Sequence, residues 1–322
     1  MDSVDGLQKK IVKKIFVFSL VLFFSSCSKF TVEKITPKNV NADVQVFSIS
    51  GKLNAFHYVP NEIRHKGIVI TLGGSEGSAG EWYAAPLANL GYEVLAVYYF
   101  GKGNLPKLLS EVPLEFFDEV LNYIEKNCKG KKPITLIGGS KGAELAALLT
   151  MYYPQIDNIV LYAPAHVVFQ GLDYTSSKSS WTIKKQAVPF VPLLQNAYSK
   201  IKYEDNAMVL RLMYETAVET APEEILKKAS IDLSNFQGKA LIFAGGCDGL
   251  WQSDKAAEIL HKQKPEHIEL HIFEKAGHSF GSPSAGNPAV IGGIKNGGSP
   301  EENKKAAIES SKLLLDFLAA LH

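Results

Sequence analysis

The chain has 322 residues, of which 46% are hydrophobic and 21% are charged. This balance is typical of a globular protein and excludes an intrinsically disordered chain. The net charge is +1, and Arg64 and Arg211 are the only arginines. Because nucleic-acid binding needs a concentrated basic surface, we expect a small-molecule substrate and no nucleic-acid partner.

The three cysteines, Cys27, Cys128 and Cys247, do not have the spacing of a metal site. Their odd number also argues against a disulfide framework. We therefore expect no metal and no cofactor, with Cys128 and Cys247 as free thiols. A disulfide between these two cysteines in an oxidising compartment is the alternative.

The first thirty residues have the layout of a secretory signal peptide. Four lysines lie within residues 9–14, and an apolar run interrupted only by Ser19 extends over residues 15–24. About ten apolar residues are too few to cross a bilayer, which needs roughly 20. The stretch Phe24-Ser25-Ser26-Cys27 resembles a bacterial lipoprotein signal. The resemblance implies cleavage before Cys27 and lipidation of that cysteine.

A lipid anchor at Cys27 would hold the protein at the membrane of the cell envelope, outside the cytoplasm. Residues 28–42 are polar and contain Pro37, which predicts a tether between the lipid and a folded domain over residues 43–322. An uncleaved amphipathic anchor is the alternative interpretation of residues 1–27. A cytoplasmic protein follows if the signal is not used.

From residue 43 onward, strand-like and helix-like segments alternate, which is typical of a parallel sheet covered by helices on both faces. Residues 43–58 predict a hairpin that turns near Gly51. Apolar runs predict the later strands, and helical spacing of apolar residues predicts the helices. The expected strands are 67–72, 93–97, 134–137, 159–162, 241–244 and 268–273, and the expected helices are 81–90, one opened by Pro113, 143–152 and 300–321.

Residues 166–238 do not follow this alternation of strands and helices. They contain Ser/Lys-rich turns, three prolines and short helical stretches such as 207–220. We interpret them as a cap insertion over the carboxyl edge of the sheet, between the strands at 159–162 and 241–244. Residues 279–299 are rich in Gly, Ser, Pro and Asn and predict an exposed loop.

The pattern Gly-x-Ser-x-Gly occurs twice, with Ser75 and Ser140 at the two centres. It places a serine on a sharp turn between a strand and a helix. Ser140 follows a predicted strand and leads directly into a helix, whereas glycines after Ser75 delay the next helix. We therefore predict Ser140 as a nucleophile. The loop of Ser75 is then expected to supply half of an oxyanion hole, through the amide of Ser75 or Glu76, and the amide of Lys141 the other half.

A serine nucleophile needs a general base, and the α/β-hydrolase fold has the chain order nucleophile, acid, histidine. Asp248 and His278 follow two predicted strands in this order. Because parallel strands end at one edge of a sheet, Ser140, Asp248 and His278 predict a catalytic triad at that edge. Asp254 is a competing carboxylate, which we interpret as complementing the dipole of its own helix.

Several stretches resemble the catalytic domain of acyl-CoA thioesterases and bile acid-CoA:amino acid N-acyltransferases. They are GGSEGSAGEWYAAPLANLGYEVLAVYYFG, LPKLLSEVPLEFFDEVLNYI, ITLIGGSKGAELAALL, IVLYAPAHVVFQG and GGCDGLWQS. The resemblance implies an α/β-hydrolase fold and an acyl-enzyme mechanism. The serine at the nucleophile position, Ser140, resembles the thioesterase branch of the family. Members often have two adjacent aspartates where this chain has Cys247 and Asp248, so Asp248 matches the predicted triad acid.

The predicted function is a serine hydrolase that acts on an acyl ester or thioester. An acyltransferase that passes the acyl group to an amine or alcohol is the first alternative, because it uses the same acyl-enzyme. A non-catalytic, ligand-binding surface lipoprotein is the second alternative, and the intact triad argues against it. Acyl-CoA is scarce outside the cytoplasm, so the predicted envelope location leaves the substrate open.

Overall fold

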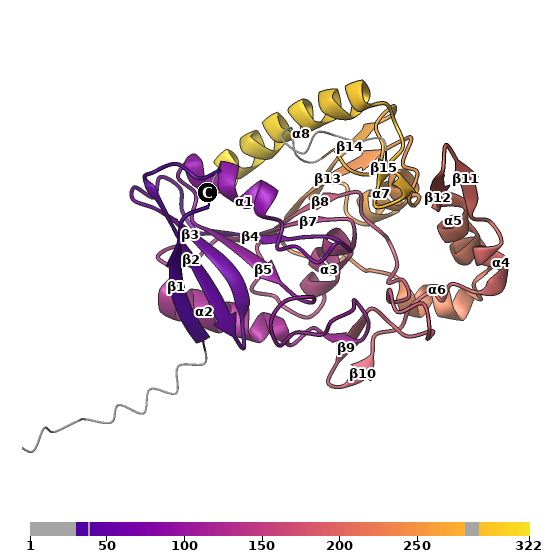
Figure 1. The fold of residues 1–322 in the computed structure, drawn as a ribbon, viewed down its shortest axis with the longest axis horizontal. Coiled ribbons are helices and arrows are strands. Elements are labelled where there is room, and N and C mark those ends of the chain that lie inside the picture. Colours follow the sequence, from indigo (N-terminus) through magenta and orange to yellow (C-terminus); the bar gives the residue numbers. More distant parts are fainter. Residues whose placement is uncertain (1–29, 38, 281–289) are drawn as a thin grey trace, which may run out of the picture.

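The computed structural model describes residues 30–37, 39–280 and 290–322. The strands of its central sheet are β1 (Phe30–Ile35), β2 (Val44–Gly51), β3 (Asn54–Pro60), β4 (Ile68–Leu72), β5 (Val94–Tyr98), β7 (Ile134–Gly139), β8 (Asn158–Tyr162), β13 (Lys239–Gly245) and β14 (Ile268–Phe273). They form one sheet of nine strands in the order β1-β2-β3-β5-β4-β7-β8-β13-β14 (Figure 1). The strands from β5 to β14 in this order are parallel, and β1, β2 and β3 are antiparallel to their neighbours. The predicted mostly parallel sheet is confirmed.

Helices cover both faces of the sheet. They are α1 (Glu81–Asn89), α2 (Phe116–Asn127), α3 (Lys141–Thr150), α7 (Ser253–Gln263) and α8 (Pro300–Leu321). The apolar residues of α1 and α8 share one core cluster, and those of α2, α3 and α7 share another. Successive side chains of β4 alternate between the two clusters, Ile68 and Ile70 joining one and Val69 the other. The α/β-hydrolase architecture predicted from the sequence is therefore correct.

The first described residues belong to the sheet. β1 pairs with β2 along its whole length, so the prediction of a tether over residues 28–42 is wrong for residues 30–35. The four central residues of β1 are exposed. Its sequence FTVEKI alternates between apolar and polar residues only as far as Glu33, which is a weak signal for a strand. The hairpin expected over residues 43–58 is confirmed as β2 and β3, whereas the predicted signal segment and Cys27 lie outside the described residues.

The cap insertion follows β8 and ends before β13, as predicted. Its elements are β9 (Trp181–Ile183), β10 (Gln186–Ala187), α4 (Gln195–Tyr198), β11 (Lys202–Glu204), β12 (Ala207–Val209), α5 (Arg211–Thr220) and α6 (Glu223–Ala229). Figure 1 shows them along the right-hand side of the molecule. Cap residues such as Phe169 and Tyr214 share a core cluster with Trp251 of the main domain. The cap is thus packed on the sheet domain and is not a separate domain.

The helix predicted to open at Pro113 begins instead at Phe116. Pro113 lies in the short strand β6 (Val112–Pro113), which pairs with β9 of the cap. The amide of Leu114 continues this pairing by donating to the carbonyl of Thr182 at 2.9 Å. Contacts with the cap therefore keep these residues extended and delay the helix, a long-range effect that local sequence does not reveal.

Residues 279–299 were predicted as an exposed loop, and this prediction is wrong for residues 290–295. These residues form a hairpin of β15 (Val290–Ile291) and β16 (Ile294–Lys295). The hairpin joins the cap in a four-stranded sheet with the order β11-β12-β16-β15. Strands of two residues are too short to show periodicity in a sequence, which is why they were missed.

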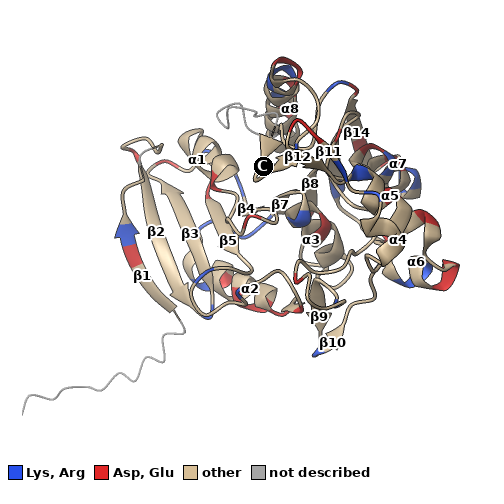
Figure 2. Cartoon of the chain, turned by 45° about the vertical axis from the view of Figure 1, so that its right-hand side comes forward, with Lys and Arg blue, Asp and Glu red and all other residues tan. Residues whose placement is uncertain are grey.

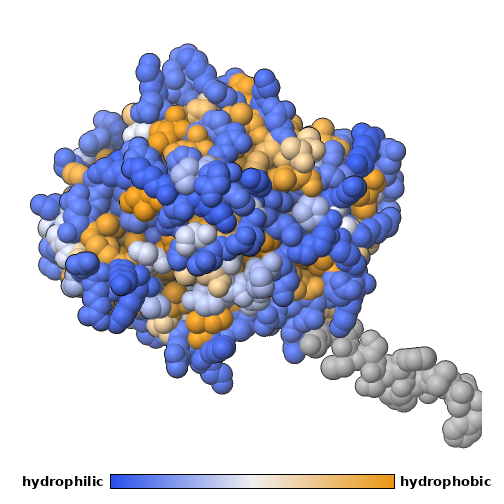
Figure 3. Space-filling model, turned by 180° about the vertical axis from the view of Figure 1, so that it is seen from behind, coloured by the Kyte–Doolittle hydropathy of each residue, from blue (hydrophilic) through white to orange (hydrophobic). Residues whose placement is uncertain are grey.

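Charges of both signs are distributed over the surface. Figure 2 shows acidic and basic residues interspersed along the helices and on β1. From the side opposite to the view of Figure 1, apolar residues lie in separate patches among hydrophilic ones (Figure 3). Within the described ranges, no helix combines the length and the apolar character needed to cross a lipid bilayer.

Candidate active site

Ser140 lies on the tight turn between β7 and α3. Its φ is 54° and its ψ is −120°, a backbone conformation that residues other than glycine rarely adopt. A Cβ atom on Gly138 would lie 2.1 Å from the Gly142 carbonyl oxygen, and one on Gly142 would lie 2.2 Å from that of Gly73. Both glycines of the motif are therefore required by close backbone approach. The turn has the geometry predicted for a nucleophile elbow.

Asp248 follows β13, and His278 follows β14. The Nδ1 atom of His278 lies 2.8 Å from Oδ2 of Asp248, and the two side chains are 7% and 0% exposed. Oδ2 also accepts a hydrogen bond from the Ser253 hydroxyl at 2.6 Å. Oδ1 accepts from the amides of Leu250 at 2.8 Å and Trp251 at 3.1 Å. The carboxylate is fixed by these bonds, and it fixes the orientation of the imidazole.

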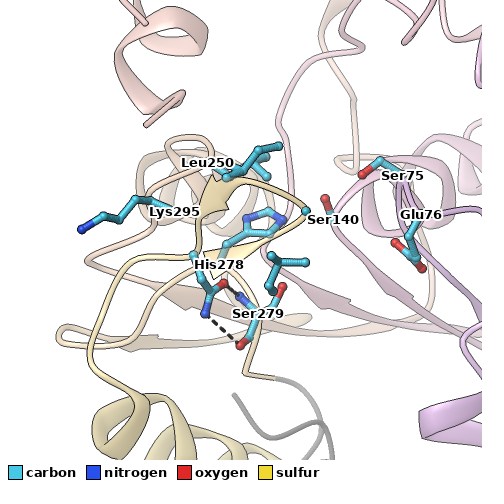
Figure 4. A pocket seen from close by; sticks show the side chains of 11 residues that line it. Ser75, Glu76, Ser140, Leu250, His278, Ser279 and Lys295 are labelled. Carbon is cyan, nitrogen blue, oxygen red and sulfur yellow. Dashed lines mark hydrogen bonds between the residues drawn. The ribbon is translucent and has the colours of Figure 1, made fainter. Parts of the chain in front are cut away.

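The other ring nitrogen of His278, Nε2, is buried and has no hydrogen-bond partner among the described residues. Ser140 and His278 line the same pocket, and Figure 4 shows the imidazole beside Ser140. Because Asp248 engages Nδ1, Nε2 is the nitrogen left to accept a proton. Hydrogen bonds between a nucleophile and its base often tighten only when substrate binds. The structure thus brings the three predicted triad residues to one edge of the sheet.

A segment far from His278 in sequence holds the loop of this histidine. The carbonyl of Asn296 accepts from the His278 amide at 2.7 Å, and its side-chain oxygen accepts from the Ser279 amide at 2.6 Å. A β-bridge joins the next residue, Gly297, to Asp248. Asn296 is only 2% exposed and was not predicted to contribute, because asparagine in a glycine-rich stretch is typical of an exposed turn.

The loop that precedes α1 contributes Ser75 and Glu76 to the same pocket. Oε1 of Glu76 accepts hydrogen bonds from the Gly74 amide at 2.8 Å and from the Ser78 hydroxyl at 2.5 Å. The carboxylate therefore folds back on its own loop, and the amides of Ser75 and Glu76 have no acceptor among the described residues. The amide of Lys141 lies in the first turn of α3, where helices leave N–H groups unpaired. These are the amides predicted to form an oxyanion hole.

The side chain of Lys141 has a role that the sequence analysis did not predict. Its Nζ donates to both carboxylate oxygens of Glu144, at 2.9 and 2.8 Å, and to the hydroxyl of Ser180 at 2.9 Å. Nε1 of Trp181 donates to the same carboxylate at 2.8 Å. Burial lowers the pKa of Lys141 and raises the pKa of Glu144. A lysine and a glutamate three residues apart usually form an exposed helix pair, so their sequence gave no sign of this buried link to the cap.

The pocket has a volume of about 220 Å³ and two chemically different walls. Ser75 and Glu76 form the polar wall. The apolar wall is made by Leu250, Ile291 and Ile294, and the polar residues Ser279, Lys295 and Asn296 also line the pocket. Figure 4 shows Ser75 and Glu76 on one side of Ser140, and Leu250 on the other. The pocket can therefore distinguish a polar from an apolar part of a bound molecule.

A buried group of metal-ligating side chains lies elsewhere, at His57, Glu93 and Cys128, with ligand atoms within 4.8 Å of one another. Nε2 of His57 lies 3.0 Å from Oε1 of Glu93 and 3.7 Å from Sγ of Cys128. The Glu93 oxygens also accept from the amides of Lys129 and Gly130. Burial raises the pKa of the Cys128 thiol. These groups satisfy one another as a hydrogen-bonded network, and we assign them no catalytic role.

Comparison with known proteins identifies the family. Residues 112–321 match the family model described as BAAT / Acyl-CoA thioester hydrolase C terminal. The chain belongs to this family. The match includes the elbow of Ser140 and the loops of Asp248 and His278, and it confirms the resemblance seen in the sequence.

Curated members of the BAAT/acyl-CoA thioester hydrolase family are similar to most of the chain. Mitochondrial acyl-coenzyme A thioesterase 2 of Mus musculus is 26% identical over 279 residues, which cover 83% of this chain and 58% of that protein. Acyl-coenzyme A thioesterase 6 of Mus musculus is 30% identical over 266 residues, which cover 77% of this chain and 58% of that protein. The chain thus spans little more than half the length of these relatives.

Solved structures share the fold at lower identity. Carboxyl esterase 2 of Tuber melanosporum matches with a TM-score of 0.50 and 18% identity, over 92% of this chain and 88% of that one. Acetyl xylan esterase 1 of Thermoanaerobacterium sp. JW/SL YS485 matches with a TM-score of 0.50 and 12% identity, over 78% of this chain and 83% of that one. These two structures therefore share the α/β-hydrolase fold with most of the chain.

Proposed function

We propose that the chain is an acyl hydrolase that cleaves an ester or thioester through a serine acyl-enzyme. Ser140 is the nucleophile, His278 the general base and Asp248 the acid that orients the base. One observation carries the proposal: the His278 imidazole is bound by Asp248 at Nδ1, while its buried Nε2 lies beside Ser140 and has no partner in the described part of the chain. Serine–histidine–aspartate catalysis requires this arrangement.

In the first half-reaction, Oγ of Ser140 attacks the acyl carbonyl carbon, and its proton passes to Nε2 of His278. The carbonyl oxygen becomes an oxyanion, which accepts hydrogen bonds from the amides of Lys141 and of Ser75 or Glu76. The tetrahedral intermediate then collapses. The bond to the leaving thiolate or alkoxide breaks, and that group takes the proton from His278. The products are a Ser140 acyl ester and a free thiol or alcohol.

In the second half-reaction, a water molecule gives its proton to Nε2 of His278 and attacks the Ser140 acyl ester. The same amides stabilise the second oxyanion. The bond to Ser140 Oγ breaks, His278 returns the proton to Oγ, and the carboxylic acid leaves. An amine or alcohol in place of water would give acyl transfer through the same steps.

We propose an acyl thioester as the preferred substrate class. The support is the family match together with the names of the relatives, which are acyl-coenzyme A thioesterases. Hydrolysis is proposed over transfer because the chain carries serine at the nucleophile position, which is similar to the thioesterase branch. Analysis of the products formed with and without an amine acceptor separates the two outcomes.

The nucleophile is tested with a fluorophosphonate probe and with turnover of butyryl-CoA and p-nitrophenyl butyrate. Ser140→Ala is expected to abolish probe labelling and to lower turnover by several orders of magnitude, because the nucleophile is lost. Ser75→Ala is the matched variant, since it removes the hydroxyl from the other Gly-x-Ser-x-Gly motif and keeps the amide. It should still be labelled. Labelling of Ser140→Ala together with loss of labelling in Ser75→Ala would reverse the assignment.

We further propose that the protein is anchored in the cell envelope by lipidation of Cys27. The support is the basic head, the short apolar run and the small residues that precede Cys27 in the sequence. Labelled palmitate should be incorporated in cells and lost in Cys27→Ala. Cys247→Ala is the control, because Cys247 is an exposed free cysteine of the folded domain. Equal incorporation into wild type and Cys27→Ala would reject lipidation at Cys27, and no incorporation into wild type would favour a cytoplasmic protein.

A further inference from the structure

An apolar row crosses the small sheet that joins the cap to the β15–β16 hairpin. Tyr203 pairs with Met208, Met208 pairs with Ile294, and Ile294 pairs with Ile291. Residues directly opposite one another on neighbouring strands project from the same face of a sheet. The four side chains therefore form one continuous row, one from each of β11, β12, β16 and β15.

The ends of this row are open to solvent. Tyr203 is 74% exposed and Ile291 is 43% exposed. The two central members are half-buried and pack against the core of the cap. Apolar surface that continues from a ligand pocket often extends the binding site. The row is therefore a candidate binding surface whose occupant must be apolar.

The row is continuous with the catalytic pocket. Ile291 and Ile294 belong to both, and with Leu250 they make up the apolar wall beside Ser140. From Ile294 the row continues over two strand spacings, about 10 Å, to Tyr203. The polar wall of Ser75 and Glu76 lies on the other side of Ser140, so it offers no comparable path for an apolar chain (Figure 4).

Charged groups near the row are paired with one another. Nζ of Lys295 lies 2.6 Å from Oδ2 of Asp205 and 3.9 Å from Oε2 of Glu204. Figure 4 shows the Lys295 side chain pointing away from His278. The two carboxylates sit at the turn of β11 and β12 and the ammonium sits on β16, so the cluster keeps one net negative charge. Lys295, the member of this cluster that lines the pocket, is therefore paired and presents no free ammonium to an aliphatic chain.

We propose that Tyr203, Met208, Ile294 and Ile291 form the subsite for the distal part of the substrate's acyl chain. This inference rests on the proposed acyl hydrolase function. The carbonyl carbon lies at Ser140, the first methylenes contact Leu250 and Ile294, and a longer chain continues across β12 to the ring of Tyr203. Because burial of one methylene changes an equilibrium about fourfold at most, each methylene that reaches the row should raise kcat/KM by up to about fourfold.

The test compares p-nitrophenyl esters of butyrate, octanoate and laurate below their aggregation limits. Tyr203→Ser should lower the ratio of laurate to butyrate kcat/KM by about tenfold, and Tyr203→Phe should restore it, since the ring without its hydroxyl keeps the apolar surface. Tyr203 is largely exposed, so neither substitution threatens folding. Ile308→Ser removes a 56% exposed isoleucine on α8 and should leave the ratio unchanged.

The outcomes separate this inference from the proposed function. If Ser140→Ala abolishes turnover but Tyr203→Ser leaves the chain-length ratio unchanged, the subsite is wrong and the hydrolase assignment stands. If Ser140→Ala retains turnover, the assignment of the nucleophile fails instead. If Tyr203→Ser weakens binding to phosphatidylcholine vesicles without changing the ratio for soluble esters, the row contacts a membrane and the acyl subsite is rejected.

Discussion

Arg211 of the cap binds both carboxylate oxygens of Asp254 in the main domain, with Nη2 at 2.9 and 3.0 Å. The same guanidinium contacts Glu215 through Nε at 3.1 Å. Asp254 follows the triad acid Asp248 by six residues, so this clamp fixes the cap beside the catalytic loop. Interpreting Asp254 as a partner of the helix dipole alone therefore missed its main interaction.

Arg211→Lys should lower the free energy of unfolding by roughly 1–2 kcal/mol, because lysine cannot reproduce the planar guanidinium contacts with two carboxylates. Urea denaturation measures the change. Arg64→Lys is the matched control, since Arg64 pairs with Glu62 at an exposed position and should change stability by less than about 0.5 kcal/mol. Equal effects of the two substitutions would show that the clamp does not hold the cap.

Asp248→Asn should lower kcat by about 10³–10⁴-fold while the protein stays folded, because the amide cannot hold the His278 tautomer that accepts a proton at Nε2. Ser253→Ala removes one hydrogen bond from Asp248 and should have a much smaller effect. Steady-state kinetics with circular dichroism as a folding check measure both. A kcat for Asp248→Asn within tenfold of wild type would contradict the role of Asp248.

Glu76→Ala should lower kcat by about 10–100-fold with little change in KM, because the loop that presents the Ser75 and Glu76 amides loses its internal support. Glu76→Gln keeps an oxygen that can accept from the Gly74 amide and should retain most of the activity. A large increase in KM for Glu76→Gln would instead show that the carboxylate contacts the substrate.

His166 should make stability depend on pH. Burial lowers its pKa from 6.5 to about 4, and its Nδ1 has no partner among the described residues. Between these values the unfolded chain binds a proton that the folded chain does not bind. The contribution of neutral His166 to the free energy of unfolding is therefore fully present above pH 6.5. It is lost as the pH falls toward 4, by up to about 3 kcal/mol.

His166→Phe should flatten this pH dependence, because phenylalanine fills the buried space without titrating. The measurement is the free energy of unfolding at several pH values between 4 and 7. His271→Gln is the control at a partly exposed strand position. If the slope between pH 4 and 6.5 is the same in wild type and His166→Phe, another group controls acid stability.

The sequence predicted the parts of the fold that have strong local patterns. The buried strand β4 is apolar apart from Thr71, and the Ser140 motif has a strand before it and a helix after it. The chain order of Ser140, Asp248 and His278 then predicted the triad, which the structure brings to one edge. The prediction failed where structure depends on distant contacts. The apolar alternation of β1 stops at Glu33, and Pro113 is held extended by the cap.

The remaining features involve residues whose partners lie far away in sequence. Asn296 supports the loops of His278 and Asp248, and Lys141 reaches Ser180 of the cap. Asn296 lies outside the motifs, and Lys141 fills a position of the Gly-x-Ser-x-Gly motif that any residue type can occupy. Each is of a type usually found at the surface. Only the fold shows that they are buried and what they bind.

The buried link from Lys141 to the cap limits how the cap of this chain can be replaced by that of another protein. The amide of Lys141 is a proposed oxyanion donor, while its side chain and that of Glu144 bind Ser180 and Trp181 of the cap. A chimaera with a foreign cap would leave a buried ammonium and carboxylate without two of their partners, next to the nucleophile. Transplanting substrate preference in this scaffold therefore requires moving these four residues together as one unit.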